Sequence, residues 1–148
     1  MKELHGTASA VVPATQDRCL ELLEAVDRYP EWHPEVVKSV EVLESDAGGQ
    51  PSKVRAKLRV ERPPVAKDFD LVMAVAIDPP GAVDLTRVQD DPSDRERFAF
   101  AWRLEPDGGT RIQLAMDANL DVPWFLPLGR IGDSLAEEFV TAAARALA

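Results

Sequence analysis

Residues 98–120, with the sequence FAFAWRLEPDGGTRIQLAMDANL, decide the fold because two alternating strands meet there at a tight turn. Aromatic side chains occupy every second position of the first strand, at Phe98, Phe100 and Trp102, and the turn follows at residues 107–110. The second strand alternates in the same way from Ile112 to Leu120. Successive side chains of a strand point to opposite faces, so the stretch predicts an antiparallel hairpin with one apolar face.

A long helix is expected to follow this hairpin, from about Trp124 to the end of the chain. Its apolar and small residues recur at steps of three or four, as a helix with one buried side requires. They are Phe125, Leu128, Gly132, Leu135, Phe139, Ala142 and Ala146. The small residues either let the helix lie close to a sheet or leave room beside it, and the sequence leaves both alternatives open.

The remaining sequence predicts further strands and two short helical pieces. Strands are expected over residues 5–12, 36–43, 53–59, 69–77 and 83–88, with a short helix capped by Thr15 and a turn or one-turn helix over 29–34. Asp68 and Asp70 are expected to pair with basic residues of the 53–59 strand across a hairpin near residues 63–64. We therefore predict one α+β domain over residues 1–148, with about seven curved antiparallel strands around a long C-terminal helix (order β-α-α-β-β-β-β-β-β-α).

This arrangement is expected to be hollow. Seven strands about 4.8 Å apart make a sheet roughly 30 Å wide, whereas a helix with its side chains is only about 10–12 Å across. The sheet must curl, and bulky side chains or a bound molecule must fill the remaining space. The phenylalanine, tryptophan and methionine residues of the inward rows would make a wall suited to an apolar ligand, although each could equally be core.

Composition excludes several classes of function. The 148 residues include 26 acidic and 17 basic ones, for a net charge of -9, which argues against nucleic acid or an anionic membrane as a partner. Cys19 is the single cysteine, so no internal disulfide is possible. We expect its side chain to lie in the hydrophobic core. No apolar run is long enough to span a membrane and the first residues do not resemble a signal peptide, so we expect a cytoplasmic protein.

Two residues are candidates for chemistry. Arg87 has the same strand parity as Val83 and Leu85 and would point inward, where it needs an acidic partner or a ligand oxygen, unless the strand ends before it. His33 lies in the turn between Trp32 and Pro34, near the expected cavity mouth, where it could act as an acid or base or be merely structural. No histidine and carboxylate spacing indicates a metal site, and we expect no cofactor.

Taken in order, four segments resemble the START-like (SRPBCC) superfamily with the helix-grip fold, in its polyketide cyclase/dehydrase-like branch. They are residues 11–14 (VVPA), residues 27–34 (DRYPEWHP), residues 102–110 (WRLEPDGGT) and the long C-terminal helix. The resemblance covers nearly the whole chain and implies a cavity between the bent sheet and the last helix. Ubiquinone-binding members tend to have Phe in place of Trp32 and a different pair after Pro34, where this chain has Glu35 and Val36, which weakens a quinone function.

Three functions remain open. We favour a carrier or sensor of a hydrophobic or aromatic small molecule. The alternatives are a cyclase or dehydratase acting on a polyketide-like substrate, with Arg87 and His33 as tentative catalytic residues, and a protein-binding module with a filled cavity. We expect the protein to be a monomer or a homodimer. Candidate ligand-binding residues are Trp32, Leu71, Met73, Leu85, Arg87, Phe98, Phe100, Trp102, Met116, Phe125, Leu128, Leu135 and Phe139.

Overall fold

The computed structural model describes residues 2–62, 65–121 and 130–148. Its elements follow the predicted order: β1 (Lys2–Val12), α1 (Gln16–Glu24), η1 (Val26–Arg28), α2 (Tyr29–Trp32), β2 (Val37–Ser45), β3 (Pro51–Arg62), β4 (Val65–Asp78), β5 (Ala82–Arg87), β6 (Arg97–Pro106), β7 (Thr110–Leu120) and α3 (Ile131–Ala146).

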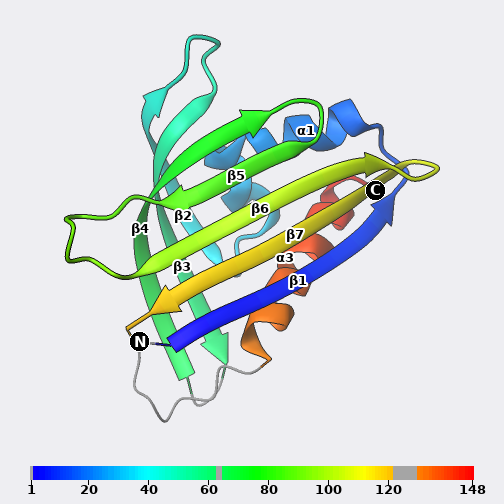
Figure 1. The fold of residues 1–148 in the computed structure, drawn as a ribbon. Helices are drawn as coiled ribbons and strands as arrows, with labels where there is room; N and C mark the ends of the chain where they lie inside the picture. The colour runs from blue at the N-terminus through cyan, green and yellow to red at the C-terminus, as the bar shows by residue number, and fades with distance from the viewer. Residues whose placement is uncertain (1, 63–64, 122–129) are drawn as a thin grey trace.

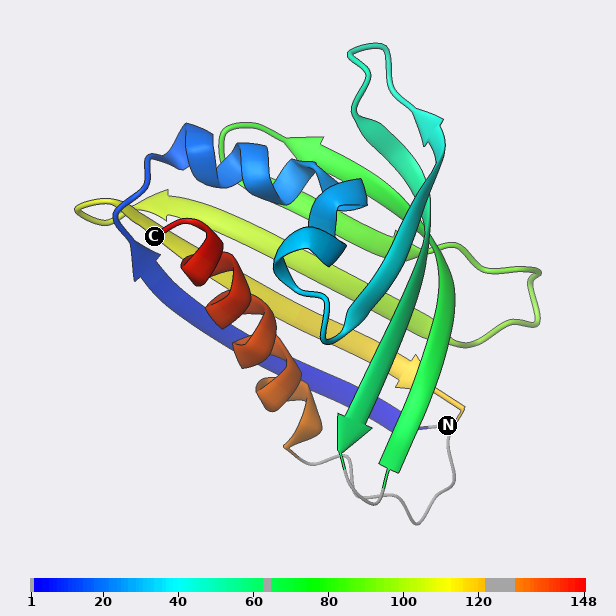
Figure 2. The same ribbon diagram turned by 180° about the vertical axis from the view of Figure 1, so that it is seen from behind.

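The strands form one antiparallel sheet of seven strands in the order β1-β7-β6-β5-β4-β3-β2. The sheet is strongly curved, and all the helices lie against its concave face (Figures 1 and 2). Helix α3 packs on β1 and β7 at one side, while η1 and α2 pack near β2 at the other. This is the helix-grip α+β fold expected from the sequence.

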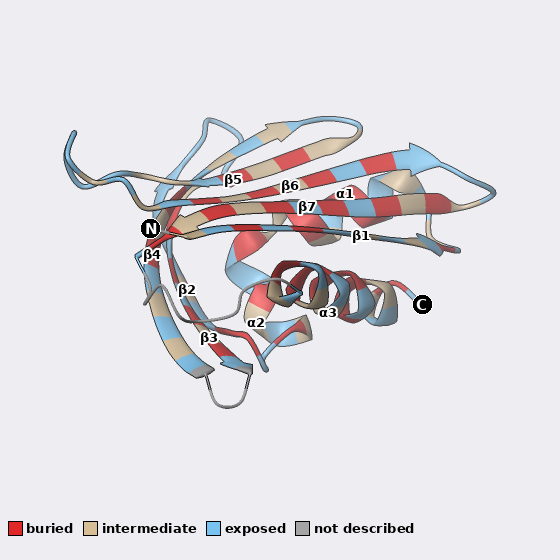
Figure 3. Ribbon diagram, turned by 60° about the horizontal axis from the view of Figure 1, so that its bottom comes forward, coloured by how far each residue is buried: buried red, intermediate tan, exposed pale blue. Residues whose placement is uncertain are grey.

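The hairpin predicted for residues 98–120 is confirmed as β6 and β7. Phe100 pairs with Met116 and Trp102 pairs with Leu114, and all four side chains are buried on the concave face. Figure 3 shows buried and exposed positions alternating along these strands, so the two-residue period separates core from surface as predicted.

Charged side chains on the convex face of β3 and β4 pair as expected. Arg55 Nη2 lies 2.6 Å from Asp70 Oδ2, and Arg59 Nη1 lies 2.9 Å from Asp68 Oδ1. Exposed ion pairs of this kind add little to stability because water and salt screen them. Their main effect is on register, because a slip by one residue would bury these charges.

The two short helical pieces also agree with the sequence. The Thr15 hydroxyl accepts a hydrogen bond from the Arg18 backbone N–H at 3.3 Å and caps α1, and Cys19 is fully buried. The one-turn helix α2 is fixed by Tyr29, whose hydroxyl donates to the Leu23 carbonyl oxygen at 2.7 Å. The backbone after α1 is therefore held in place over the concave face.

Helix α3 begins at Ile131, and the predicted first turns from Trp124, with Phe125 and Leu128, lie outside the described residues. A Cβ atom placed on Gly132 would lie only 2.1 Å from the His5 carbonyl oxygen of β1. Beside this contact the Thr7 backbone N–H donates to Asp133 Oδ1 at 3.0 Å. Of the two alternatives for Gly132, close approach of the helix to the sheet is therefore correct.

Candidate functional site: an apolar cavity under the last helix

An apolar cavity lies between the concave face of the sheet and the helices. Three elements on the helical side and five strands contribute residues to it. Its walls are formed by Val26, Tyr29, Val37, Val40, Ala56, Leu58, Leu71, Met73, Leu85, Phe100, Trp102 and Phe139, and no polar surface is exposed inside it.

The free volume of this cavity is only about 30 Å³. Aromatic rings fill much of the space: the ring centroids of Phe98 and Phe100 are 5.0 Å apart, and those of Phe100 and Phe139 are 5.3 Å apart. Pockets for small ligands usually measure about 300–1,000 Å³. Side chains therefore fill most of the hollow expected from the width of the sheet, and only a small void remains.

Ten of the thirteen predicted binding residues fall into three groups; Arg87 is described below, and Phe125 and Leu128 lie outside the described residues. Those in the cavity wall are Leu71, Met73, Leu85, Phe100, Trp102 and Phe139. Phe98, Met116 and Leu135 are buried in the surrounding core but do not line this cavity. Trp32 instead lines two surface grooves beside α2, of about 300 and 420 Å³.

Half of the wall was not singled out from the sequence as a binding surface. The additional residues come from η1, α2, β2 and β3, and are Val26, Tyr29, Val37, Val40, Ala56 and Leu58. The two-residue period of β3 places Ala56 and Leu58 together on the strand face opposite its basic residues. Only the curl of the sheet, which brings β2 and β3 over toward α3, shows that these positions face the same space as Phe139.

The polar atoms of the two largest wall residues are already hydrogen-bonded, which keeps the cavity apolar. Tyr29 donates its hydroxyl proton to Leu23 and is also hydrogen-bonded with the side chain of Trp102. Burial raises the pKa of the Tyr29 hydroxyl far above its usual value, and the bond with Trp102 only partly opposes this. A ligand in this space would therefore meet hydrocarbon and ring surfaces alone.

His33 lies next to this wall. Only 4% of the residue is exposed, and its ring packs edge-on against Phe139 with 4.5 Å between the centroids. Its Nε2 atom and the Nε1 atom of Trp32 are buried without a hydrogen-bond partner. Burial lowers the pKa of His33 below its usual value, while the charges of Glu138 and Glu35 act in the opposite direction.

The lowered pKa of His33 predicts a contribution to the pH dependence of stability. Above the ordinary histidine pKa of about 6.5, the imidazole is neutral in both states and contributes nothing. As the pH falls through this value the unfolded chain binds the proton first, so the free energy of unfolding decreases until the folded protein is protonated as well. We expect His33→Gln to lose this component. Urea denaturation of both proteins at pH 7.5 and 5.5 checks it, and parallel losses of stability would show that His33 is not buried as described.

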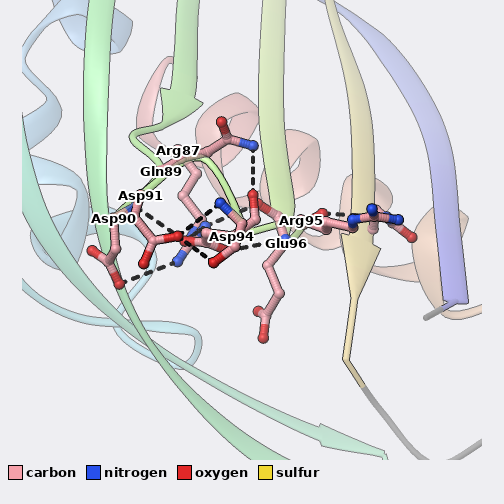
Figure 4. A network of polar contacts seen from close by, with 9 residues as sticks. Arg87, Gln89, Asp90, Asp91, Asp94, Arg95 and Glu96 are labelled. Carbon is pink, nitrogen blue, oxygen red and sulfur yellow. Dashed lines mark hydrogen bonds and ion pairs between the residues drawn. The ribbon is translucent and has the colours of Figure 1, made fainter.

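The Arg87 side chain contacts the connection between β5 and β6. Its side chain is 13% exposed, its Nη1 atom lies 2.8 Å from Asp94 Oδ2, and the same nitrogen donates to the Glu96 carbonyl oxygen at 2.9 Å. Figure 4 shows these contacts holding the connection between β5 and β6 together. The Asp90 backbone N–H and then Arg87 keep the pKa of Asp94 below its usual range.

Asp94 thus supplies the acidic partner that the sequence argument required for Arg87, and Arg87 is not part of the cavity wall. Its catalytic role stays a prediction. Within the described ranges, histidine, cysteine and carboxylate side chains form no cluster able to hold a metal ion. Nor does any helix in those ranges have the length and apolar character needed to cross a membrane.

Comparison with known proteins agrees with this architecture. The sequence model of a family described as polyketide cyclase / dehydrase and lipid transport matches residues 3–148. Among curated proteins, no sequence is significantly similar to this chain.

Several solved structures share the fold at low sequence identity. A START superfamily protein from Mycobacterium smegmatis aligns with a TM-score of 0.76 at 18% identity, covering 97% of this chain and 96% of its own. The di-domain ARO/CYC protein BexL from the BE-7585A biosynthetic pathway gives 0.70 at 9% identity, covering 98% of this chain and 50% of its own. Major latex-like protein 151 from Panax ginseng gives 0.63 at 14% identity, covering 97% and 93%.

Proposed function

The chain belongs to the polyketide cyclase / dehydrase and lipid transport family, and from that premise we propose that it binds a small hydrophobic or aromatic molecule as a carrier or sensor. The main support for the proposal is the wholly apolar cavity lined by residues of α3, α2, η1 and the sheet. The family description names lipids and polyketides, and both offer apolar surface to such a wall.

Binding requires the cavity to expand from about 30 Å³. Helix α3 is tied to β1 at its first turn by the Gly132 contact and by the bond from Thr7 to Asp133. Toward α2, by contrast, it is held by ring packing between His33 and Phe139. Side chains can change rotamer without breaking backbone hydrogen bonds, so expansion is expected on the α2 side of the helix.

A neutral fluorescent aromatic, N-phenyl-1-naphthylamine, tests the proposal. We expect saturable binding of one probe per chain, with the rise in fluorescence that transfer into an apolar site produces. Val37→Ile adds one methylene to a wall residue that is 2% exposed, and this added volume is comparable with the free volume of the cavity. Such a change in an apolar pocket is expected to weaken binding by about tenfold or more.

The matched control is Val42→Ile, which adds the same methylene to an exposed position of the same strand. It should leave the affinity unchanged. Equal affinities of both variants would place the probe elsewhere. Absence of saturable binding by this probe and by a wider apolar library would favour the third reading, a protein-binding module whose cavity is simply core.

A second role, as a cyclase or dehydratase, would use the same cavity and add a proton transfer. His33 supports it, because a buried imidazole with a lowered pKa is neutral near pH 7 and able to accept a proton. Arg87 would act only through the loop that it holds. Turnover of a polyketide-like substrate that is unchanged in His33→Gln would exclude this role for the histidine.

A further inference from the structure

Two side-chain nitrogens at the end of α2 stand out because they are buried and unpaired. These are Trp32 Nε1 and His33 Nε2. Only one other such atom occurs among the described residues, Asp117 Oδ1, and it lies 2.7 Å from His5 Nδ1 on the convex face. Buried polar groups normally have hydrogen-bond partners. Two neighbouring nitrogens without one therefore indicate that a partner is missing, which a bound molecule could supply.

Both side chains line the same surface groove, of about 420 Å³, between α2 and α3. The rings of Trp32 and His33 are nearly parallel, at 15°, with centroids 6.2 Å apart. His33 also contacts Phe139, and Phe139 forms part of the inner cavity wall. His33 therefore lies between the groove and the wall of the inner cavity, with Trp32 beside it.

This position suits the polar end of a ligand whose apolar part lies in the inner cavity. The indole N–H can only donate a hydrogen bond, and a neutral imidazole nitrogen can accept or donate one. A hydroxyl group can serve both side chains at once, and a carbonyl oxygen can accept from either.

The charge of the groove argues against an anionic group. Glu35, Glu137 and Glu138 line it, opposed by Arg145, and the whole chain carries a net charge of -9. Burial also keeps His33 neutral at pH 7, so it offers no positive charge to a carboxylate or phosphate. Repulsion by the surrounding carboxylates would weaken binding of either anion.

We propose that Trp32 and His33 hold a neutral hydroxyl or carbonyl group of the ligand at the junction of the groove and the inner cavity. This inference rests on the proposed binding function and deepens it: the ligand is an uncharged amphipathic molecule, such as an alcohol, phenol or ketone, and not a fatty acid or a phospholipid headgroup.

Three probes that share one ring system test the inference by calorimetric titration at pH 7.5: 2-naphthol, 2-methylnaphthalene and 2-naphthoate. The wild-type protein should bind 2-naphthol about two- to tenfold more tightly than 2-methylnaphthalene for each hydrogen bond formed. It should bind 2-naphthoate more weakly than either.

Two variants each remove one nitrogen but keep an aromatic ring, Trp32→Phe and His33→Phe. Each should reduce the ratio of the 2-naphthol affinity to the 2-methylnaphthalene affinity, which is compared within the same variant. His5→Phe, on the exposed part of β1, is the matched control and should alter neither affinity.

An unchanged preference in both folded variants, or tighter binding of 2-naphthoate, would overturn the inference while leaving the cavity function standing. If 2-methylnaphthalene binds and 2-naphthol shows no preference in the wild-type protein, the inference is likewise wrong. If none of the three probes binds, the proposed function itself fails and the inference fails with it.

Discussion

Gly132→Ala is expected to destabilise the protein strongly, although alanine normally favours a helix interior over glycine by about 1 kcal/mol. The added Cβ would lie 2.1 Å from the carbonyl oxygen of His5 and 2.6 Å from its carbonyl carbon. Both are backbone atoms of β1 and cannot rotate away, so α3 and the strand would have to separate. We expect a loss of at least about 3 kcal/mol, a large share of the roughly 5–15 kcal/mol typical of a domain.

Equilibrium unfolding in urea measures this loss of stability. Two further variants serve as a reciprocal test and as a control. Gly6→Ala makes the reciprocal contact, with its Cβ 2.0 Å from the carbonyl carbon of Gly132, and should be comparably harmful. Gly48→Ala is the control, since its nearest atom is Asp46 Oδ1 at 3.4 Å, and should change stability by less than about 0.5 kcal/mol. A Gly132→Ala protein as stable as wild type would show that helix and strand do not touch as described.

Phe139→Ala should have the second largest effect, a loss of about 3–5 kcal/mol. Phe139 is 3% exposed and its ring joins the inner cavity wall to His33. Removing the ring deletes buried apolar surface and leaves a larger void under the helix. The measurement is again urea denaturation, now with and without saturating N-phenyl-1-naphthylamine.

The probe should stabilise Phe139→Ala more than it stabilises the wild-type protein, because the enlarged cavity no longer has to expand. Phe69→Ala removes a ring that is only half-buried and lies outside the cavity wall, so it should cost less and show no extra stabilisation by the probe. A loss below about 1 kcal/mol in Phe139→Ala, or equal stabilisation of all three proteins, would contradict the placement of the ring.

Strand faces and helix caps could be predicted because they depend on neighbouring residues. The period of two placed Phe98, Phe100 and Trp102 on the buried face of β6. The same period placed the basic residues of β3 on one face of the sheet with Asp68 and Asp70, and the ion pairs confirm this. Toward the C-terminal end of β4 the same alternation is less clear, since Val75 and Ile77 are only half-buried.

Features that depend on contacts between distant residues could not be predicted. The sequence leaves the role of Gly132 open, because Gly6, against which it packs, lies 126 residues earlier in the chain. Arg87 was expected to need a partner, but only the path of the β5–β6 connection shows that Asp94 is that partner. The free volume of the cavity depends on how rings from β6 and α3 interlock, which no periodicity in the sequence describes.

Methyl NMR of the protein with saturating N-phenyl-1-naphthylamine tests the central claim most directly, namely that the apolar space under α3 opens to take a guest. We predict large shifts for the methyl groups of Val37, Leu71 and Met73, which face the cavity, and none for Ala115 and Val11, which are exposed. Shifts confined to the exposed methyls, or no shift at Met73 at saturation, would mean that the space under the helix is closed core and that the account is wrong.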